Sequence, residues 1–179
     1  MARVVVFLRG VNLVSRNRVS MPVLREALEE ADFEKVTTYV QSGNVVVTTT
    51  QPVRAVPATV AAVVKERFGV EIGVVVRTRA QLAAVVKRNP LEKIARNPKL
   101  YHVTFLEKAP APAAVERLEA AAVGGETVVR VGRELYSWHP DGMGRSKLGR
   151  LLSDKGLGVT ATSRNWATVT AVLALADAS

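Results

Sequence analysis

The chain has 179 residues, of which 23% are charged, and its formal net charge is +9. This length allows one domain or two small fused units with a buried core. The chain has no cysteine, which excludes thiol catalysis and cysteine-ligated metals and fits a reducing compartment. The apolar run at the N-terminus is too short for a signal peptide, and no later run could span a bilayer, so we expect a cytoplasmic protein.

The first half of the chain predicts the order strand–helix–strand–strand–helix–strand. The apolar run at 3–10 is typical of a strand, and residues 20–33 have helical spacing with Ser20 as the expected N-cap. Residues 35–41 and 44–50 read as two strands joined by a tight turn. A helix at 53–69 and a strand at 71–77 complete the order of a ferredoxin-like split β-α-β unit.

The second half predicts a similar order after an irregular link. A connecting helix at 80–90 runs into two Asn-Pro steps, at 89–90 and 97–98. The expected elements that follow are a strand at 100–108, a helix at 112–122, strands at 127–132 and 134–138, a helix at 146–154, a short strand at 158–161 and a last helix at 165–176. We therefore predict an α+β protein of two fused ferredoxin-like subdomains, 1–78 and 101–179, the second with a C-terminal helix and both joined by 79–100.

Two polar, glycine-containing segments of the first subdomain are expected to meet. In the predicted sheet the end of the first strand lies beside the turn that joins the second and third strands. That topology brings the segment RGVN next to the segment QSGN, with the following loop at the same end of the sheet. The residues of this predicted patch are Arg9, Asn12, Arg16, Arg18, Gln41, Ser42 and Asn44.

The positive charge is concentrated between residues 77 and 99. This stretch holds seven basic residues and one acidic residue, and a localised basic field attracts polyanions. A solubilising surface is the alternative interpretation. The candidate contacts to a polyanion are Arg77, Arg79, Lys87 and Arg88.

Two further motifs could bind an anion. Residues 140–148 form a glycine-rich loop that runs into a helix, with Arg145, Ser146 and Lys147 at the helix start, where unpaired backbone amides attract anions. The alternative is a turn with Ser146 as an ordinary N-cap. In the second motif, Arg164 and Asn165 precede a helix that begins near Trp166, for which we expect a place in the core.

The histidines do not predict a catalytic or metal site. His102 and His139 are the only two, and neither has a neighbouring acidic cluster in the sequence. His139 is the one candidate for acid–base chemistry, because it lies close to the glycine-rich loop. The sequence contains no dinucleotide fingerprint, and we expect no metal and no cofactor.

The segments FLRGVN, MPVLREALEEADFEKVTTYVQSGNVVV, HPDGMGRSKL and TSRNWATV identify a resemblance. In this order they resemble a bacterial family catalogued as domain of unknown function 1697, over essentially the whole chain. The resemblance implies two fused α+β subdomains and no settled activity. Asp32 stands where a glycine often closes the first helix.

Three functions of different classes remain open on the sequence. The leading hypothesis is non-specific binding of DNA or RNA through the basic surface, which would also involve the two anion-binding motifs. The chain has only nine aromatic residues and no evident exposed aromatic pair for base stacking, which speaks against it. The alternatives are an enzyme or sensor for a small phosphorylated ligand, and a scaffold or oligomerisation protein.

Overall fold

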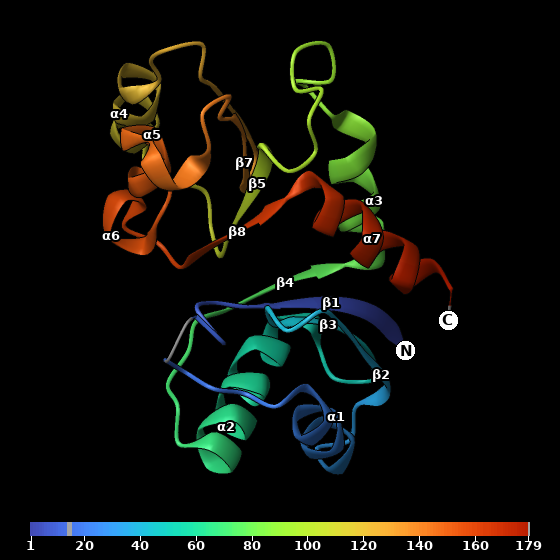
Figure 1. Ribbon diagram of the computed structural model, residues 1–179. Coiled ribbons are helices and arrows are strands. Elements are labelled where there is room, and N and C mark those ends of the chain that lie inside the picture. Colours follow the sequence, from blue (N-terminus) through green and yellow to red (C-terminus); the bar gives the residue numbers. More distant parts are fainter. Residues whose placement is uncertain (14–15, 179) are drawn as a thin grey trace. The chain divides into compact units, whose positions relative to one another are not determined.

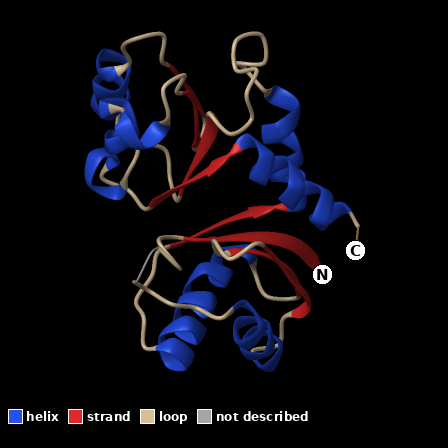
Figure 2. Ribbon diagram, viewed as in Figure 1, coloured by secondary structure: helices blue, strands red, loops and turns tan. Residues whose placement is uncertain are grey.

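The computed structural model describes residues 1–13 and 16–178. It shows an α+β protein with two four-stranded antiparallel sheets and helices (Figures 1 and 2). The chain divides into two compact units, one formed by residues 1–84 and 171–179 and the other by residues 85–170. The division falls inside two helices, whereas the boundaries suggested by the sequence lie at residues 78 and 100.

The elements of the first unit follow the predicted order. They are β1 (Ala2–Leu8), α1 (Met21–Glu30), β2 (Glu34–Tyr39), β3 (Asn44–Thr49), the single 3-10 turn η1 (Val53–Ala55), α2 (Val56–Phe68) and β4 (Val74–Thr78). The strand order in the sheet is β2-β3-β1-β4, and all neighbouring strands are antiparallel. The turn between β2 and β3 is therefore at the same edge as the end of β1.

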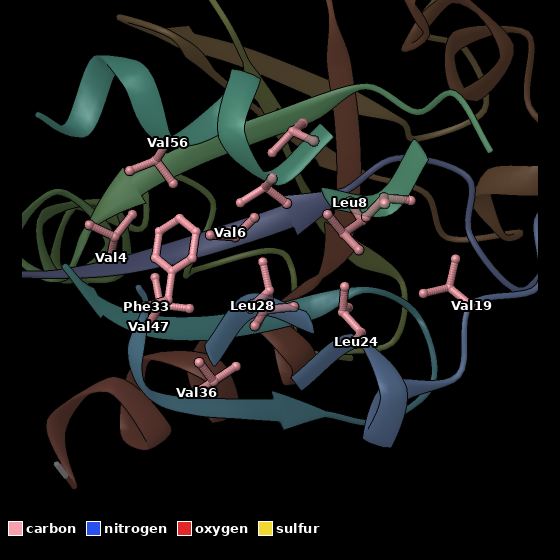
Figure 3. Close-up of a cluster of buried hydrophobic side chains, with 14 of the residues drawn as sticks. Val4, Val6, Leu8, Val19, Leu24, Leu28, Phe33, Val36, Val47 and Val56 are labelled. Atoms are coloured by element: carbon pink, nitrogen blue, oxygen red, sulfur yellow. The ribbon is translucent and has the colours of Figure 1, made fainter. Parts of the chain in front are cut away.

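The core of the first unit lies between its sheet and the helices α1 and α2 (Figures 1 and 3). Alternate residues of β1 point to one face of the sheet. Val4, Val6 and Leu8 are fully buried there, against Leu24 and Leu28 of α1. Full burial of each of these side chains contributes about 1.5–3 kcal/mol, so this layer accounts for much of the stability of the unit.

Local sequence signals explain where the helices of this unit begin and end. Gly69 closes α2 in the left-handed conformation, with φ of 68°. After α1 the same role falls to Asp32, which has φ of 64° although a glycine would suit that conformation better. The helix α3 (Arg79–Arg88) begins with a capping box, in which Thr78 and Gln81 each accept a hydrogen bond from the other's backbone amide.

The second unit repeats the strand arrangement of the first. Its elements are β5 (Tyr101–Leu106), α4 (Pro112–Ala121), β6 (Thr127–Val131), β7 (Glu134–Trp138), η2 (Met143–Arg145), α5 (Lys147–Leu151), α6 (Asp154–Leu157), β8 (Ala161–Asn165) and the start of α7 (Trp166–Asp177). The strand order is β6-β7-β5-β8. Leu106, Leu135 and Ala161 face a core that includes Leu118 of α4 and Leu148 of α5.

The structure corrects two predictions in the second unit. The helix expected at 146–154 is two short helices, because Ser153 caps α6 by accepting a hydrogen bond from the Gly156 amide. The strand expected at 158–161 begins only at Ala161 and continues to Asn165, since this segment pairs with β5. Arg164 therefore belongs to a strand and does not lie in a loop before the last helix.

The turn between β2 and β3 makes a close approach that only glycine permits. The Leu8 amide donates to the Gly43 carbonyl over 2.8 Å, and Gly43 has φ of 77°. A Cβ at this position would lie 2.6 Å from Val11 Cγ2 and 2.7 Å from Leu8 Cβ. This contact fixes the turn against the end of β1.

We predict that Gly43→Ala lowers the free energy of unfolding by about 3 kcal/mol, from overpacking together with left-handed strain. Gly69→Ala is the matched control, because Gly69 has φ of 68° and a Cβ there would meet nothing within 4 Å. The control should lose only the strain contribution, about 1 kcal/mol. Urea unfolding of both variants measures the difference, and equal losses would show that the close approach at Gly43 is not tight.

Candidate functional site

The two polar segments of the first unit do meet at one edge of its sheet. Phe7, near the end of β1, pairs with Asn44 at the start of β3. The edge formed by residues 9–12, 16–20 and 41–44 is called here the polar edge. Among the predicted patch residues, Arg9, Arg16, Arg18, Gln41 and Ser42 are exposed, Asn12 is partly buried and Asn44 is buried.

Asn12 holds the polar edge together through its side chain. Its amide nitrogen donates to the Val19 carbonyl over 2.9 Å and to the Gln41 carbonyl over 2.6 Å. Its amide oxygen accepts from the Val19 amide over 2.8 Å. One side chain thus joins the loop after β1 to the turn before β3, and three of its four hydrogen-bonding positions are occupied. Asn12 therefore has a structural role, and only one hydrogen-bonding position of its side chain is left for a ligand.

Asn44 also serves the turn. It is fully buried, and its side-chain amide donates to the Tyr39 carbonyl over 3.2 Å and to Ser42 Oγ over 3.0 Å. A buried amide with such partners stabilises the local backbone. The exposed members of the polar edge are therefore the ones that remain accessible to a ligand.

A hollow of about 490 Å³ opens on the polar edge. It lies beside the first turn of α1, and its lining includes Asn12, Arg18, Ser20, Pro22 and Gln41. Ser20 occupies the N-cap position of α1, but its side chain makes no capping hydrogen bond. The guanidinium of Arg18, the Ser20 hydroxyl and the Gln41 amide are thus three polar groups around one hollow.

The structure separates the basic residues of 77–99 into two groups. Arg77 lies inside β4, is 1% exposed and donates to the Val76 carbonyl. Arg79 pairs with Asp177 over 2.5 Å. Arg77 is therefore buried, whereas Arg79 is exposed but held in an ion pair with Asp177.

The second group forms an exposed surface. Five basic side chains between residues 87 and 99 are exposed, with a single acid, Glu92. This stretch, the end of α3 and the loop after it, is called the basic segment; its cations are Lys87, Arg88, Lys93, Arg96 and Lys99. Among the described residues, none of the ion pairs involves these five side chains. Arg88 also hydrogen-bonds to the Tyr136 phenol, and the other four cations are available to an anionic partner.

The glycine-rich loop has a structural explanation. Ser146 caps α5 by accepting from the Gly149 amide over 2.9 Å, and α5 has only five residues. A Cβ on Gly149 would lie 2.1 Å from the Met143 carbonyl oxygen, so a glycine is required for η2 and α5 to pack. Ser146 also hydrogen-bonds to Glu126. Arg145 and Lys147 are exposed beside this cap, as expected for a solvated turn.

Glu126 connects this loop to His139. The Glu126 carboxylate lies 3.2 Å from His139 Nδ1, and His139 Nε2 lies 2.8 Å from Ser137 Oγ. Burial lowers the pKa of His139, which keeps the imidazole neutral at pH 7. Because an ionised carboxylate only accepts, Nδ1 carries the proton and Nε2 accepts from the serine hydroxyl. Hydrogen bonds to Ser146 and His139 lower the pKa of Glu126 against the opposing effect of its burial.

The order Ser137–His139–Glu126 is that of a hydrolase triad, but its position is wrong for catalysis. Ser137 and His139 are both 0% exposed, and Ser137 lies within β7. A nucleophile must reach its substrate, so this network stabilises the fold by joining β7 to two loops. His102 lies edge-on to His139, with ring centroids 5.6 Å apart.

The residues around α7 are also largely structural. Arg164 donates to Thr162 Oγ1 over 2.7 Å and to the Ser163 carbonyl over 2.9 Å, and burial lowers the pKa of its guanidinium to about 10. Asn165 caps α7 by accepting from the Thr168 amide over 2.9 Å. Trp166 is the first residue of α7, and it is partly exposed where a core position was expected.

Some residues of the His139 network and of the basic segment were not predicted from the sequence. Glu126 and Ser137 had no visible link to His139, although residues 137 and 139, two apart on an extended segment, point to the same side. Lys93, Arg96 and Lys99 belong to the basic stretch at 77–99, and the structure shows that all three are exposed. Within the described part of the chain, no group of three or more metal-ligating side chains is close enough together to hold an ion. No helix there is long and apolar enough to cross a membrane.

These observations define an α+β protein of two four-stranded antiparallel sheets with an exposed basic segment. The chain belongs to the DUF1697 family, described as a protein of unknown function, whose family model matches residues 1–136. Its fold is similar to that of the conserved bacterial protein SP0830 from Streptococcus pneumoniae, with a TM-score of 0.77, 17% sequence identity and 98% of each chain covered. No curated protein matches the chain.

We predict that Asn12→Ala lowers the free energy of unfolding by about 1–3 kcal/mol, because it leaves the Val19 amide without its partner. Asn17→Ala is the control. Both residues are left-handed, with φ of 55° at Asn12 and 51° at Asn17, but Asn17 is exposed, and the hydrogen bond described for its side chain is the one to the Gly10 carbonyl. Its loss should be smaller. Thermal melting compares the two variants, and an unchanged melting temperature for Asn12→Ala would contradict a structural role.

Acid should weaken the second unit through His102. Burial and the neighbouring His139 lower the pKa of His102 to about 4. The unfolded chain, with a pKa near 6.5, binds the proton first as the pH falls, so stability is lost between about pH 6.5 and pH 4. We expect a loss of about 2–3 kcal/mol between pH 7 and pH 4.5 from this group.

His102→Gln should remove that part of the pH dependence, whatever it does to stability at pH 7. Urea unfolding of the native protein and the variant at both pH values isolates the contribution, since the carboxylates titrate in both. Parallel pH profiles would show that His102 is not shifted.

Proposed function

We propose that the protein binds nucleic acid non-specifically, through the phosphate backbone, at the basic segment. The observation that carries the proposal is the set of five exposed cations against one acid between residues 87 and 99. Phosphate contacts by lysine and arginine supply most of non-specific binding to nucleic acid. Sequence-independent binding needs only such a surface, so the absence of a base-reading motif is compatible with it.

The loop that displays these cations is held in shape by its own backbone. The Ala95 amide donates to the Leu91 carbonyl over 2.8 Å, and the Leu100 amide donates to the Asn97 carbonyl over 3.0 Å. Leu91 is 6% exposed and anchors the loop. At the end of α3, Arg88 hydrogen-bonds to the phenol of Tyr136. An ordered loop loses less conformational entropy when it binds, which favours its use as a contact surface.

A second candidate function is binding of a small anionic ligand at the polar edge. The specific observation is the hollow of about 490 Å³ beside Arg18, Ser20 and Gln41. Arg18 would supply the charge and the two neutral side chains would supply orientation. Such a site would suit an enzyme or a sensor. A scaffold protein would use neither the basic segment nor the hollow at the polar edge.

The finer description of the fold is part of the proposal. The strand orders β2-β3-β1-β4 and β6-β7-β5-β8, with two or more helices on one face of each sheet, support a ferredoxin-like arrangement in each unit. We also propose a cytoplasmic location, which the lack of cysteine supports.

The salt dependence of binding tests the leading function. If three to five phosphates are contacted, the logarithm of the affinity should fall with the logarithm of salt at a slope of about −3 to −5 on duplex DNA. Fluorescence anisotropy with labelled oligonucleotides across a salt series measures this slope. No binding at about 50 mM salt would refute the function.

Two triple variants of equal net charge distinguish binding at the basic segment from binding that depends only on the overall charge of the protein. Replacement of Lys93, Arg96 and Lys99 by alanine should flatten the slope by about one unit per lost contact. Replacement of the exposed Lys108, Arg117 and Lys155 removes the same charge elsewhere in the second unit and should leave the slope nearly unchanged. Equal effects of both variants would assign the binding to overall charge.

A further inference from the structure

The few aromatic residues of the chain include a group beside the basic segment, where a nucleic-acid base could stack on them. The chain has two tryptophans, and both lie in the second unit. Trp138 ends β7, and Trp166 begins α7 directly after β8. Each is partly exposed. They come from segments far apart in the sequence, so no sequence motif predicts that they lie at the same end of the sheet.

Tyr101 brings the two tryptophans to one end of the sheet. It is the first residue of β5 and pairs directly with Trp138, which places both side chains on the same face. The Tyr101 ring also stacks on the Trp166 indole, with centroids 4.7 Å apart and planes 18° apart. In Figure 1, β5 and β7 lie side by side, and β8 leads into α7. Tyr101 itself is 1% exposed, so the Trp166 indole packs on a buried ring.

The face that carries these rings differs from the face that packs on α4, α5 and α6. Leu106 and Leu135 belong to the helix-covered core, and residues of the opposite parity point away from it. Tyr101, an odd number of positions from Leu106, and Trp138, an odd number from Leu135, lie on the other face. The tryptophans are thus not part of the core formed by those helices.

The basic segment ends between the two tryptophans. The Pro98 carbonyl accepts from the amide of Ala167, next to Trp166, over 3.4 Å. The Leu100 carbonyl accepts from the amide of His139, next to Trp138, over 3.1 Å. Lys99 lies between these two anchors and is exposed, and Arg96 is exposed three residues before it. Cationic and aromatic groups therefore meet at one end of the second sheet.

We infer that the basic segment takes single-stranded nucleic acid in preference to duplex, with an unpaired base against the exposed part of an indole and phosphates on Lys99 and Arg96. The inference rests on the proposed function and specifies its ligand. Stacking on an aromatic side chain requires a base whose face is free, which a single strand offers and a duplex does not. Such stacking tolerates any sequence, as expected for a non-specific binder.

The test compares a single-stranded oligothymidine with a duplex of equal length at the same low salt. Tryptophan emission should be quenched by the single strand, and the single strand should bind about tenfold more tightly than the duplex. Thymine oligomers form no self-structure, so the comparison reports strand type alone. Because both tryptophans lie at this end of the sheet, the emission change reports the proposed contact without any mutation.

Variants locate the contact. Trp138→Leu and Trp166→Leu should each reduce the preference for the single strand, while duplex binding stays unchanged. Since Trp166 also packs on Tyr101, a Lys99→Glu variant tests the same position without altering the aromatic stack, and it should weaken binding of the single strand about tenfold. Lys108→Glu is the matched control, because Lys108 is exposed and follows the opposite end of β5.

The outcomes distinguish the inference from the function on which it rests. Equal affinity for both strand types with unchanged emission would overturn the inference and leave non-specific binding intact. Absence of binding to either form would refute the proposed function as well. Equal weakening by Lys99→Glu and Lys108→Glu would also overturn the inference, since binding would then follow net charge.

Discussion

The close packing of Gly43 against Leu8 and Val11 is the constraint on which the polar edge depends. Its carbonyl accepts from the Leu8 amide, so the turn before β3 and the end of β1 are locked in one register. Asn12 can then reach Gln41 and Val19 at once, because the two loops are held at hydrogen-bond distance. The hollow beside Arg18 is lined by both of these loops and by the first turn of α1.

In the first unit, Gly43 and Asn12 hold neighbouring loops together. In the second unit, the carboxylate of Glu126 has this role. Glu126 bonds to His139 and Ser146 and so ties the β7 end to the loop before α5. Its low pKa and the neutral imidazole describe a network that is complete at neutral pH. The motif HPDGMGRSKL is accordingly explained by packing and capping, with Gly149 admitting the Met143 carbonyl and Ser146 ending the loop.

Much of the fold was predictable because it depends on local patterns. Apolar runs such as RVVVFL predicted strands, the helical spacing up to Gly69 predicted a helix, and the strand order then brought RGVN to QSGN. The solvent exposure of individual basic side chains was not predictable from such local patterns. Arg77 follows three valines within a strand, and nothing in that pattern says which face it takes or that it is buried. Arg164 occupies the corresponding place, since Val103 pairs with it as Val5 pairs with Arg77.

The gathering of Trp138 and Trp166 on Tyr101 has a consequence for spectroscopy. Both indoles belong to the unit of residues 85–170, and the other unit contains none. The tryptophan emission of the protein is therefore a local reporter of one unit, whereas far-ultraviolet circular dichroism averages over helices and strands of both. A denaturation midpoint that differs between the two signals would measure how far the units lose their structure independently of each other. The chain thus carries its own probe of the cooperativity between its two units.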